Sequence, residues 1–433
     1  MKKKTVIIGS IIAVVLILLI VFLIPKDKNI EQPANPTVEE TLPEIEYYED
    51  AVLVDGANIS TAPSKTIQMA EGLIVYTDGT EKNWLVVYHE EKDLPLEEKT
   101  FYFSEGTILT AAFNGNNTVS KIVLPDGIIQ LDNCFNNNFI DCEVVLPATL
   151  ESYSSAFEKA QGITLSSVGN GKLTVINGVL YSDFGETLLF YPGWKQDEEL
   201  ILPTTVKAIG EEAIFNNPYL KKVVLNEGLE TINKRGIANC VSATEVILPS
   251  TLIKIDTSFS RMFNLEKLSI PTNCEVLGLN FIQAPKLTLT VDANNPYCTL
   301  EDGVLYNKDK TILMRYLESK QDVEYTLPDS VTTICSSAFS FNKYLEELTV
   351  NEGVTEIGTF FAECNALKTI NLPQSLVSLK TMTFTRLPSL TTINYAGTID
   401  QWLYVQKGPD WIISDLEYRL NCSDESIGYN GTA

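Results

Sequence analysis

The chain has 433 residues and a formal net charge of −24, with 56 acidic side chains, 32 basic ones and a single histidine, His89. The acidic excess argues against a nucleic-acid partner, because phosphate binding needs clusters of Lys and Arg. One histidine leaves little room for an imidazole base or a set of imidazole ligands, so we expect no enzyme activity, no cofactor and no metal site.

The N-terminus has the pattern of a membrane anchor. Three lysines, Lys2 to Lys4, precede residues 5–24, which carry no charge. As a helix this segment is about 30 Å long, the thickness of a bilayer core. We expect residues 1–28 to be a single-pass anchor in the cell membrane, with a cytoplasmic N-terminus and an extracellular remainder. A cleaved signal peptide is the alternative, although no small-residue cleavage site follows the apolar run.

Two further segments precede the main body of the chain. Residues 29–50 are rich in proline and acidic residues, and they are expected to form an extended tether because they cannot bury a core. Residues 51–100 hold two apolar runs, 72–76 and 84–88, around a polar turn. This pattern is typical of a β-hairpin, and it predicts an N-terminal capping region.

A repeat occupies residues 101–393. A Leu-Pro pair recurs, and Pro125 and Pro147 lie 22 residues apart, as do Pro249 and Pro271. Each unit of 22–23 residues holds a Val-x-x-Ile segment, expected to be an inward-packed turn, and a Leu-x-x-Val-x-Leu segment, expected to be a short strand. One unit cannot bury these side chains alone, so stacked units are predicted to share a continuous core.

Two inserts interrupt the repeat, near residues 173–199 and 297–324. The first contains apolar runs at 177–181 and 187–191, and the second at 302–306 and 311–316. Each insert predicts a β-hairpin. The last segment, residues 394–433, is expected to be a cap and tail, with Tyr395, Trp402, Tyr404 and Trp411 sealing the final unit rather than stacking on sugars.

The residues then show a family resemblance. The unit 327–348, Leu-Pro-Asp-Ser-Val-Thr-Thr-Ile-Cys-Ser-Ser-Ala-Phe and onward, resembles the BspA-type leucine-rich repeat of bacterial surface proteins. The insert at 302–306 and the ending Ile393–Thr398 followed by Trp402 resemble companions of that repeat. The resemblance covers roughly residues 101–422. It implies a β-rich, right-handed leucine-rich-repeat solenoid, extracellular exposure, and adhesion or partner binding.

The candidate functional residues lie on the predicted strand ladder. Alternate strand residues point out of the core, so equivalent positions of successive units form exposed columns. We expect this face to bind an extracellular protein or glycan. The alternatives are a structural spacer or envelope-assembly component and, less favoured, a cell-envelope hydrolase; the oligomeric state stays open. The candidate residues are Lys121, Val123, Glu143, Val145, Lys222, Val224, Glu245, Ile247, Lys267 and Ser269.

Other reactive residues have simpler interpretations. His89 lies in an acidic stretch that predicts a solvated turn. The cysteines lack the spacing of disulfide rungs between units, so buried free thiols are expected. The pair Asp302-Gly303 predicts a turn rather than a calcium loop, because it lacks the alternating ligands of such a loop.

Overall fold

The computed structural model describes residues 3–6, 45–48, 65–70, 73–77, 84–88, 107–110, 121–124, 127–136, 139–154, 156–157, 160–169, 171–278, 280–358, 361–413 and 417–429. The chain divides into two compact units, Met1–Gly171 and Lys172–Ala433. Among the described residues, no helix has the length and apolarity to cross a membrane. The predicted span 5–24 lies outside the described residues, except for Thr5 and Val6 in β1 (Lys3–Val6). His89 also lies outside them.

The first unit is built from short ladders of strands. Strand β1 pairs antiparallel with β2 (Ile45–Tyr48). Of the two other ladders, one contains the meander expected near residues 72–88. Its strands, in order across the sheet, are β11 (Gln161–Ser167), β9 (Phe139–Leu146), β7 (Lys121–Val123), β5 (Trp84–Tyr88), β4 (Leu73–Thr77) and β3 (Lys65–Ala70). The other ladder is β10 (Ser152–Ser154), β8 (Ile128–Asp132) and β6 (Thr107–Thr110), all parallel.

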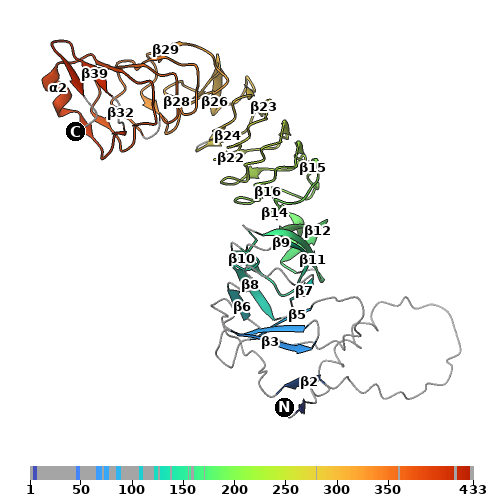
Figure 1. Ribbon diagram of the computed structural model, residues 1–433. Helices are drawn as coiled ribbons and strands as arrows, with labels where there is room; N and C mark the ends of the chain where they lie inside the picture. The colour runs from blue at the N-terminus through green and yellow to red at the C-terminus, as the bar shows by residue number, and fades with distance from the viewer. Residues whose placement is uncertain are drawn as a thin grey trace, which may run out of the picture. The chain divides into compact units, whose positions relative to one another are not determined.

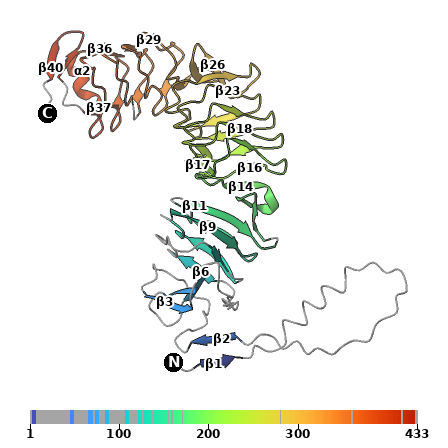
Figure 2. The ribbon, with the colours of Figure 1, turned by 45° about the vertical axis from the view of Figure 1, so that its right-hand side comes forward.

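In the second unit, strands of successive coils stack along the chain (Figures 1 and 2). One set of parallel ladders holds the predicted repeat strands. The first of these ladders, called sheet F here, contains β15 (Glu199–Ile201), β18 (Lys222–Val224), β21 (Glu245–Ile247), β23 (Lys267–Ile270) and β25 (Thr288–Val291). The second, called sheet H, contains the parallel strands β29 (Glu324–Thr326), β31 (Glu347–Thr349), β33 (Thr369–Leu372), β36 (Thr392–Tyr395) and β39 (Tyr418–Asn421). Strand β40 (Ser426–Tyr429) is added at the edge and pairs antiparallel with β39.

The Val-x-x-Ile segment, expected to be an inward-packed turn, is instead a short strand, and these strands form two ladders of their own. Their Ile residues are buried, as predicted, but their backbones pair with the next coil. Backbone N–H and C=O groups must find partners, and those of a coil point along the stack, so a straight stretch pairs with its neighbours. These strands are β16 (Ala208–Ile209), β19 (Thr231–Ile232), β22 (Lys254–Asp256), β24 (Glu275–Leu277), β30 (Thr333–Ile334), β32 (Glu356–Ile357), β34 (Ser378–Leu379) and β37 (Gln406–Lys407). Short third-side pairs are β17 (Ile214–Phe215) with β20 (Ile237–Ala238), and β35 (Phe384–Thr385) with β38 (Ile412–Ile413).

The two inserts form antiparallel meanders, and the last strand of each meander pairs with a ladder of Val-x-x-Ile strands. Strands β12 (Leu173–Ile176), β13 (Val179–Ser182) and β14 (Thr187–Phe190) pair in turn, with the short helix η1 (Asp183–Gly185) between the last two. Strands β26 (Cys298–Glu301), β27 (Val304–Asn307) and β28 (Ile312–Tyr316) repeat the arrangement. Both residues of the turns Asn177-Gly178 and Asp302-Gly303 have positive φ, as two-residue hairpin turns require. Strands β14 and β28 then pair parallel with β16 and β30, which returns the chain to the repeat.

The core is a continuous stack of apolar side chains. Within one coil, Ile209, Ile214 and Val223 point inward from the three sides and are fully buried. Aromatic rings also stack from coil to coil: the Phe339 and Phe361 centroids lie 5.1 Å apart with nearly parallel planes, and Phe384 follows at 5.6 Å. Each coil therefore buries its apolar atoms mainly against its neighbours.

A buried asparagine joins the insert to the first coil after it. The Asn217 side chain is completely buried. Its Nδ2 donates to the carbonyl oxygens of Pro192 at 3.1 Å and Lys195 at 2.9 Å, and its Oδ1 accepts from the backbone N–H groups of Tyr219 and Leu220. Both ends of the amide are therefore satisfied inside the core. Asn295 and Asn342 make the same four kinds of bond.

The C-terminal end is closed by aromatic residues and by α2 (Ile399–Tyr404). Trp402 is buried against Tyr395, with centroids 5.3 Å apart, and against Trp411, at 5.9 Å. Thr398 and Gln401 form a capping box at the start of the helix. These three aromatic residues thus pack together at the end of the chain where the sequence predicts a cap. Tyr404 is the exception, since it is 87% exposed.

The four hydrogen bonds of buried Asn217 lead to a prediction about stability. Replacing Asn217 with Ala removes four hydrogen bonds, of which those to the Pro192 carbonyl and from the Leu220 N–H are fully buried, so we expect a loss of about 2–4 kcal/mol in the free energy of unfolding. Asn294→Ala, at an exposed asparagine, is expected to change it by less than about 0.5 kcal/mol. Urea unfolding followed by circular dichroism measures both, and equal losses would contradict the assigned role.

Candidate partner-binding face

Six of the ten candidate residues come together on sheet F. Strand register places Lys222 opposite Glu245, Glu245 opposite Lys267, and Val224 opposite Ile247, while Ser269 faces Thr290. The other four lie in the first unit, where Lys121 is in register with Glu143 and Val123 with Val145. The side chains of Lys121 and Val123 lie outside the described residues, and those of Glu143 and Val145 are half-buried.

One column of sheet F alternates in charge. It runs Glu199, Lys222, Glu245, Lys267, with one residue on each successive strand. The Lys222 Nζ lies 3.1 Å from a Glu199 carboxylate oxygen and 3.9 Å from one of Glu245. The hydrogen bond and charge of Glu199 raise the pKa of Lys222 above its ordinary value. Since all these groups are solvent-exposed, the pairs neutralise the face more than they stabilise the fold.

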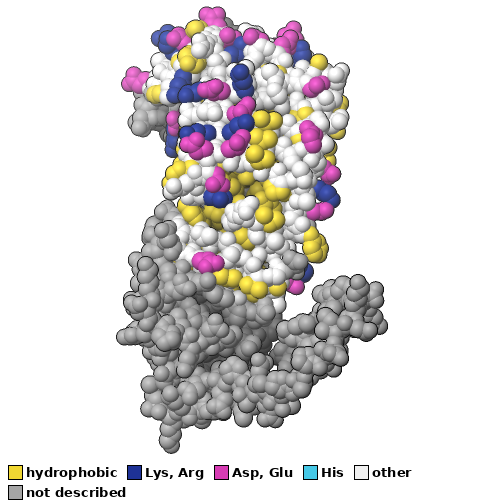
Figure 3. All heavy atoms as spheres, turned by 90° about the vertical axis from the view of Figure 1, so that its right-hand side faces the viewer, with side chains coloured by type: hydrophobic (Ala, Val, Ile, Leu, Met, Phe, Trp, Pro, Cys, Tyr) yellow, Lys and Arg dark blue, Asp and Glu magenta, His cyan; other side chains and the backbone are white. Residues whose placement is uncertain are grey.

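The neighbouring column is apolar. Ile201 is 67% exposed, Val224 is half-buried and Ile247 is 41% exposed. The column then turns polar at Ser269 and Thr290, whose hydroxyl oxygens are 2.8 Å apart. Figure 3 shows hydrophobic side chains gathered beside acidic and basic ones that alternate. Exposed apolar side chains lined up on a rigid ladder are a candidate contact surface.

The sequence analysis missed the first strand of this face. Glu199 and Ile201 lie 23 residues before Lys222 and Val224, which is the repeat period, so the signal was present. The preceding insert hid it, because the residues before β15 do not follow the repeat. The apolar column therefore begins one coil earlier than Val224.

The corresponding column of sheet H has a different chemistry. There Thr349, Asn371, Asn394 and Asn421 follow one another from strand to strand. The amide Nδ2 of Asn394 donates to Asn371 Oδ1 at 2.6 Å, and Asn421 donates to Asn394 at 2.8 Å. These amides bond to one another along the ladder. The exposed apolar stripe thus belongs to sheet F and has no counterpart at these positions of sheet H.

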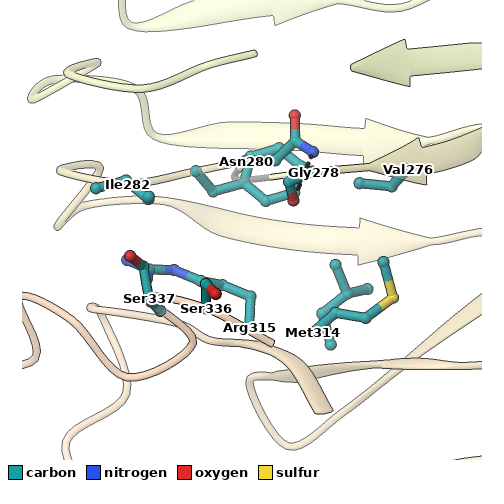
Figure 4. Close-up of a pocket in the computed structure, with 10 residues that line it drawn as sticks. Val276, Gly278, Asn280, Ile282, Met314, Arg315, Ser336 and Ser337 are labelled. Carbon is teal, nitrogen blue, oxygen red and sulfur yellow. Dashed lines mark hydrogen bonds between the residues drawn. The ribbon is translucent and has the colours of Figure 1, made fainter. Parts of the chain in front are cut away.

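A small cavity lies beside the second insert. Asn280 and Gly278 form one wall and Arg315 the other, as Figure 4 shows. Its volume is about 10 Å³, room for about one water molecule. The buried Arg315 guanidinium lies 2.6 Å from the Glu318 carboxylate and donates to the Ser340 carbonyl oxygen at 3.1 Å. Glu318 therefore offsets the charge of Arg315, although the buried Arg315 Nε has no hydrogen-bond partner. The space beside the pair is too small for a substrate.

The cysteines lie in the core rather than in a reactive site. All eight belong to the described residues and none is in a disulfide bond; six are buried, as the sequence analysis predicted. Burial raises the pKa of Cys240, Cys274 and Cys364 to about 12. At neutral pH these groups are thiols, which are poor nucleophiles. Within the part of the chain that the structure describes, no cluster of three His, Cys, Asp or Glu side chains could hold a metal ion.

Comparison with known proteins gives a family match. The model of the BspA type leucine rich repeat region, which comprises six copies, matches residues 190–311 and 310–403. The match confirms the resemblance read from the repeat, over a shorter range than residues 101–422. No curated protein matches the sequence.

Solved structures with a similar fold include two bacterial proteins. The pneumococcal vaccine antigen PcpA is 20% identical, with 81% of this chain and 86% of that chain covered and a TM-score of 0.42. A leucine rich cell surface protein from Faecalibacterium prausnitzii A2-165 is 18% identical, with 79% and 97% covered and a TM-score of 0.41.

Thiol labelling should follow burial. When the native chain is treated with iodoacetamide at neutral pH, we expect Cys422 and Cys335, which are partly exposed, to react first. The six buried cysteines should react only after denaturation, because their thiols are not accessible to the reagent. Peptide mass spectrometry gives the order. Rapid labelling of Cys240 or Cys364 in the native state would contradict the packing described.

Proposed function

Because this chain belongs to the BspA-type leucine-rich repeat family, we propose that it is a non-enzymatic binding module exposed at the bacterial cell surface. Its site is the outer face of sheet F, where the column Ile201, Val224, Ile247 lies beside the charged column. The observation that carries the proposal is the exposure of Ile201 and Ile247 at equivalent positions two coils apart, with Val224 between them.

The physical argument is that this face is rigid and already neutralised. Strand pairing on both sides holds Val224 in place, and Ile247 is paired with Val224, so contact with a partner orders little that was mobile. Because Lys222 is paired with Glu199, the adjacent charges favour a surface of mixed sign rather than a strongly basic or acidic one. A protein surface fits this combination of apolar and paired charged groups better than a glycan does.

We further propose that residues 5–24 span the cell membrane and that residues 29–50 hold the repeat region outside it. The support is the uncharged run of membrane length behind three lysines and the proline-rich acidic stretch that follows.

A purely structural spacer is the second candidate. It is favoured by sheet H, where Asn371, Asn394 and Asn421 satisfy one another and leave no apolar group exposed in that column. Such a self-paired ladder supplies solubility and stiffness without a ligand.

Substitution within the apolar column tests the binding role. A charge placed by Val224→Asp or Ile247→Asp must be desolvated when a partner binds, so we expect capture to fall at least roughly tenfold. The measurement is binding of candidate extracellular and envelope proteins to immobilised full-length chain by surface plasmon resonance.

The matched control is Thr349→Asp, at the equivalent strand position of sheet H. It adds the same charge, and we expect capture to stay unchanged. Thermal unfolding of each variant shows that the fold is intact. Unchanged capture by both sheet F variants would favour the spacer.

Membrane fractionation tests the anchor. After alkaline carbonate washing, we expect the full chain to remain in the membrane pellet and a variant lacking residues 5–24 to leave it. Protease added to intact cells should remove the repeat region. The mass of the intact protein isolated from membranes distinguishes an anchor from a cleaved signal peptide. An anchor predicts the mass of the full sequence, and a mass that lacks the N-terminal residues would contradict it.

A further inference from the structure

We propose that the partner of this face is a second copy of this chain, docked face to face across a two-fold axis that runs parallel to the strands of sheet F. This inference rests on the proposed function of the face and deepens it by naming the occupant. Its basis is the order of charges along the column Glu199, Lys222, Glu245, Lys267.

The order of charges makes the column complementary to its own reverse. A two-fold axis parallel to the strands, between Lys222 and Glu245, turns the second copy over and reverses the order of its strands. Negative, positive, negative, positive then meets positive, negative, positive, negative. Glu199 faces Lys267 of the second copy and Lys222 faces its Glu245, each contact occurring twice. All the facing charges are opposite in sign, which favours this register.

The same operation brings the apolar columns together. Because a rotation about the strand direction leaves positions along the strand unchanged, Val224 lies over Ile247 of the second copy, again twice. Ile201, the most exposed residue of the column, lies over Ser269 of the second copy. The contact would therefore cover the apolar stripe that sheet F leaves in solvent.

The other in-plane two-fold axis is disfavoured. A rotation about the stacking direction keeps the order of strands, so each coil faces its own copy. If the charged columns met in that arrangement, Glu199 would face Glu199 and Lys222 would face Lys222. Like charges in contact oppose docking, so the charge order selects the axis parallel to the strands.

The area of the contact between the two copies indicates how strongly they should bind. The facing columns extend over the strands β15, β18, β21 and β23, which at about 4.8 Å per strand give a patch roughly 15–20 Å long. Such a patch is smaller than the roughly 800 Å² per partner of a standard stable interface. We therefore expect a weak dimer that forms at high protein concentration and dissociates as salt rises.

The first experiment is sedimentation equilibrium of the purified full chain over a range of concentrations. We expect a monomer–dimer equilibrium that shifts towards monomer at high salt. A chain that stays monomeric at every concentration would overturn the proposal, and so would a dimer that is indifferent to both salt and the substitutions below.

A charge swap then separates contacts between copies from pairing within one column. Lys222→Glu alone and Glu245→Lys alone each place like charges opposite one another at the centre of the dimer, so each should weaken dimerisation roughly tenfold or more. The double variant K222E/E245K reads negative, negative, positive, positive. In the dimer this order faces the reversed order of the second copy, positive, positive, negative, negative. Every facing pair is again opposite in charge, so dimerisation should return.

Pairing within the column predicts no recovery for the double variant. Within one chain the double variant puts like charges next to each other at two places, as each single variant does, so it should be no better than they are if the column serves only its own chain. Failure of the double variant to recover dimerisation would therefore overturn the proposal. Lys207→Glu, whose partner Glu186 lies outside sheet F, makes the same charge change and should leave dimerisation unaltered.

These results are distinct from those that test the proposed function. Dimerisation is measured on the purified chain alone, whereas the proposed function is measured by capture of other proteins. Capture that is lost in Val224→Asp while the wild type stays monomeric would keep the binding face and reject the second copy as its occupant.

Discussion

Coil-to-coil dependence governs the whole structure. A single unit of 22–23 residues cannot enclose its own apolar side chains, and its backbone N–H and C=O groups point along the stack rather than across the coil. Both requirements are met only by the next coil. Ile209, Ile214 and Val223 are fully buried because neighbouring coils cover them, and the same neighbours complete the ladders on each side.

This dependence makes every interruption and every end a structural problem. An insert would break the stack, and the chain solves this by letting β14 and β28 serve at once as the last strand of a meander and the first rung of a parallel ladder. Buried Asn217 then bonds the carbonyls of the connecting segment. Near the C-terminal end, Trp402 is buried against Tyr395 and Trp411, so aromatic rings fill the core there.

Repetition also converts single residues into surfaces. A side chain at one outward position appears again about 5 Å away on the next strand, so its chemistry is multiplied along the column. On sheet F this produces an apolar stripe beside alternating charges, and on sheet H it produces a run of amides that bond to each other. Two ladders with one backbone plan thus present different faces, and the binding proposal rests on that difference.

The period of Leu-Pro pairs, read from the sequence, determined the family, the stacked architecture, the inserts and the burial of the cysteines, because each follows from local pattern and from what one unit cannot bury. The candidate columns followed from the same period wherever the repeat was regular. Tertiary structure decided the rest. Pairing of the Val-x-x-Ile segments, the rung made by Asn217 and the place of Ile201 at the head of the apolar column all depend on which coil lies next to which. Which coil lies next to which across an insert is set by packing in three dimensions. The local sequence pattern does not contain this information.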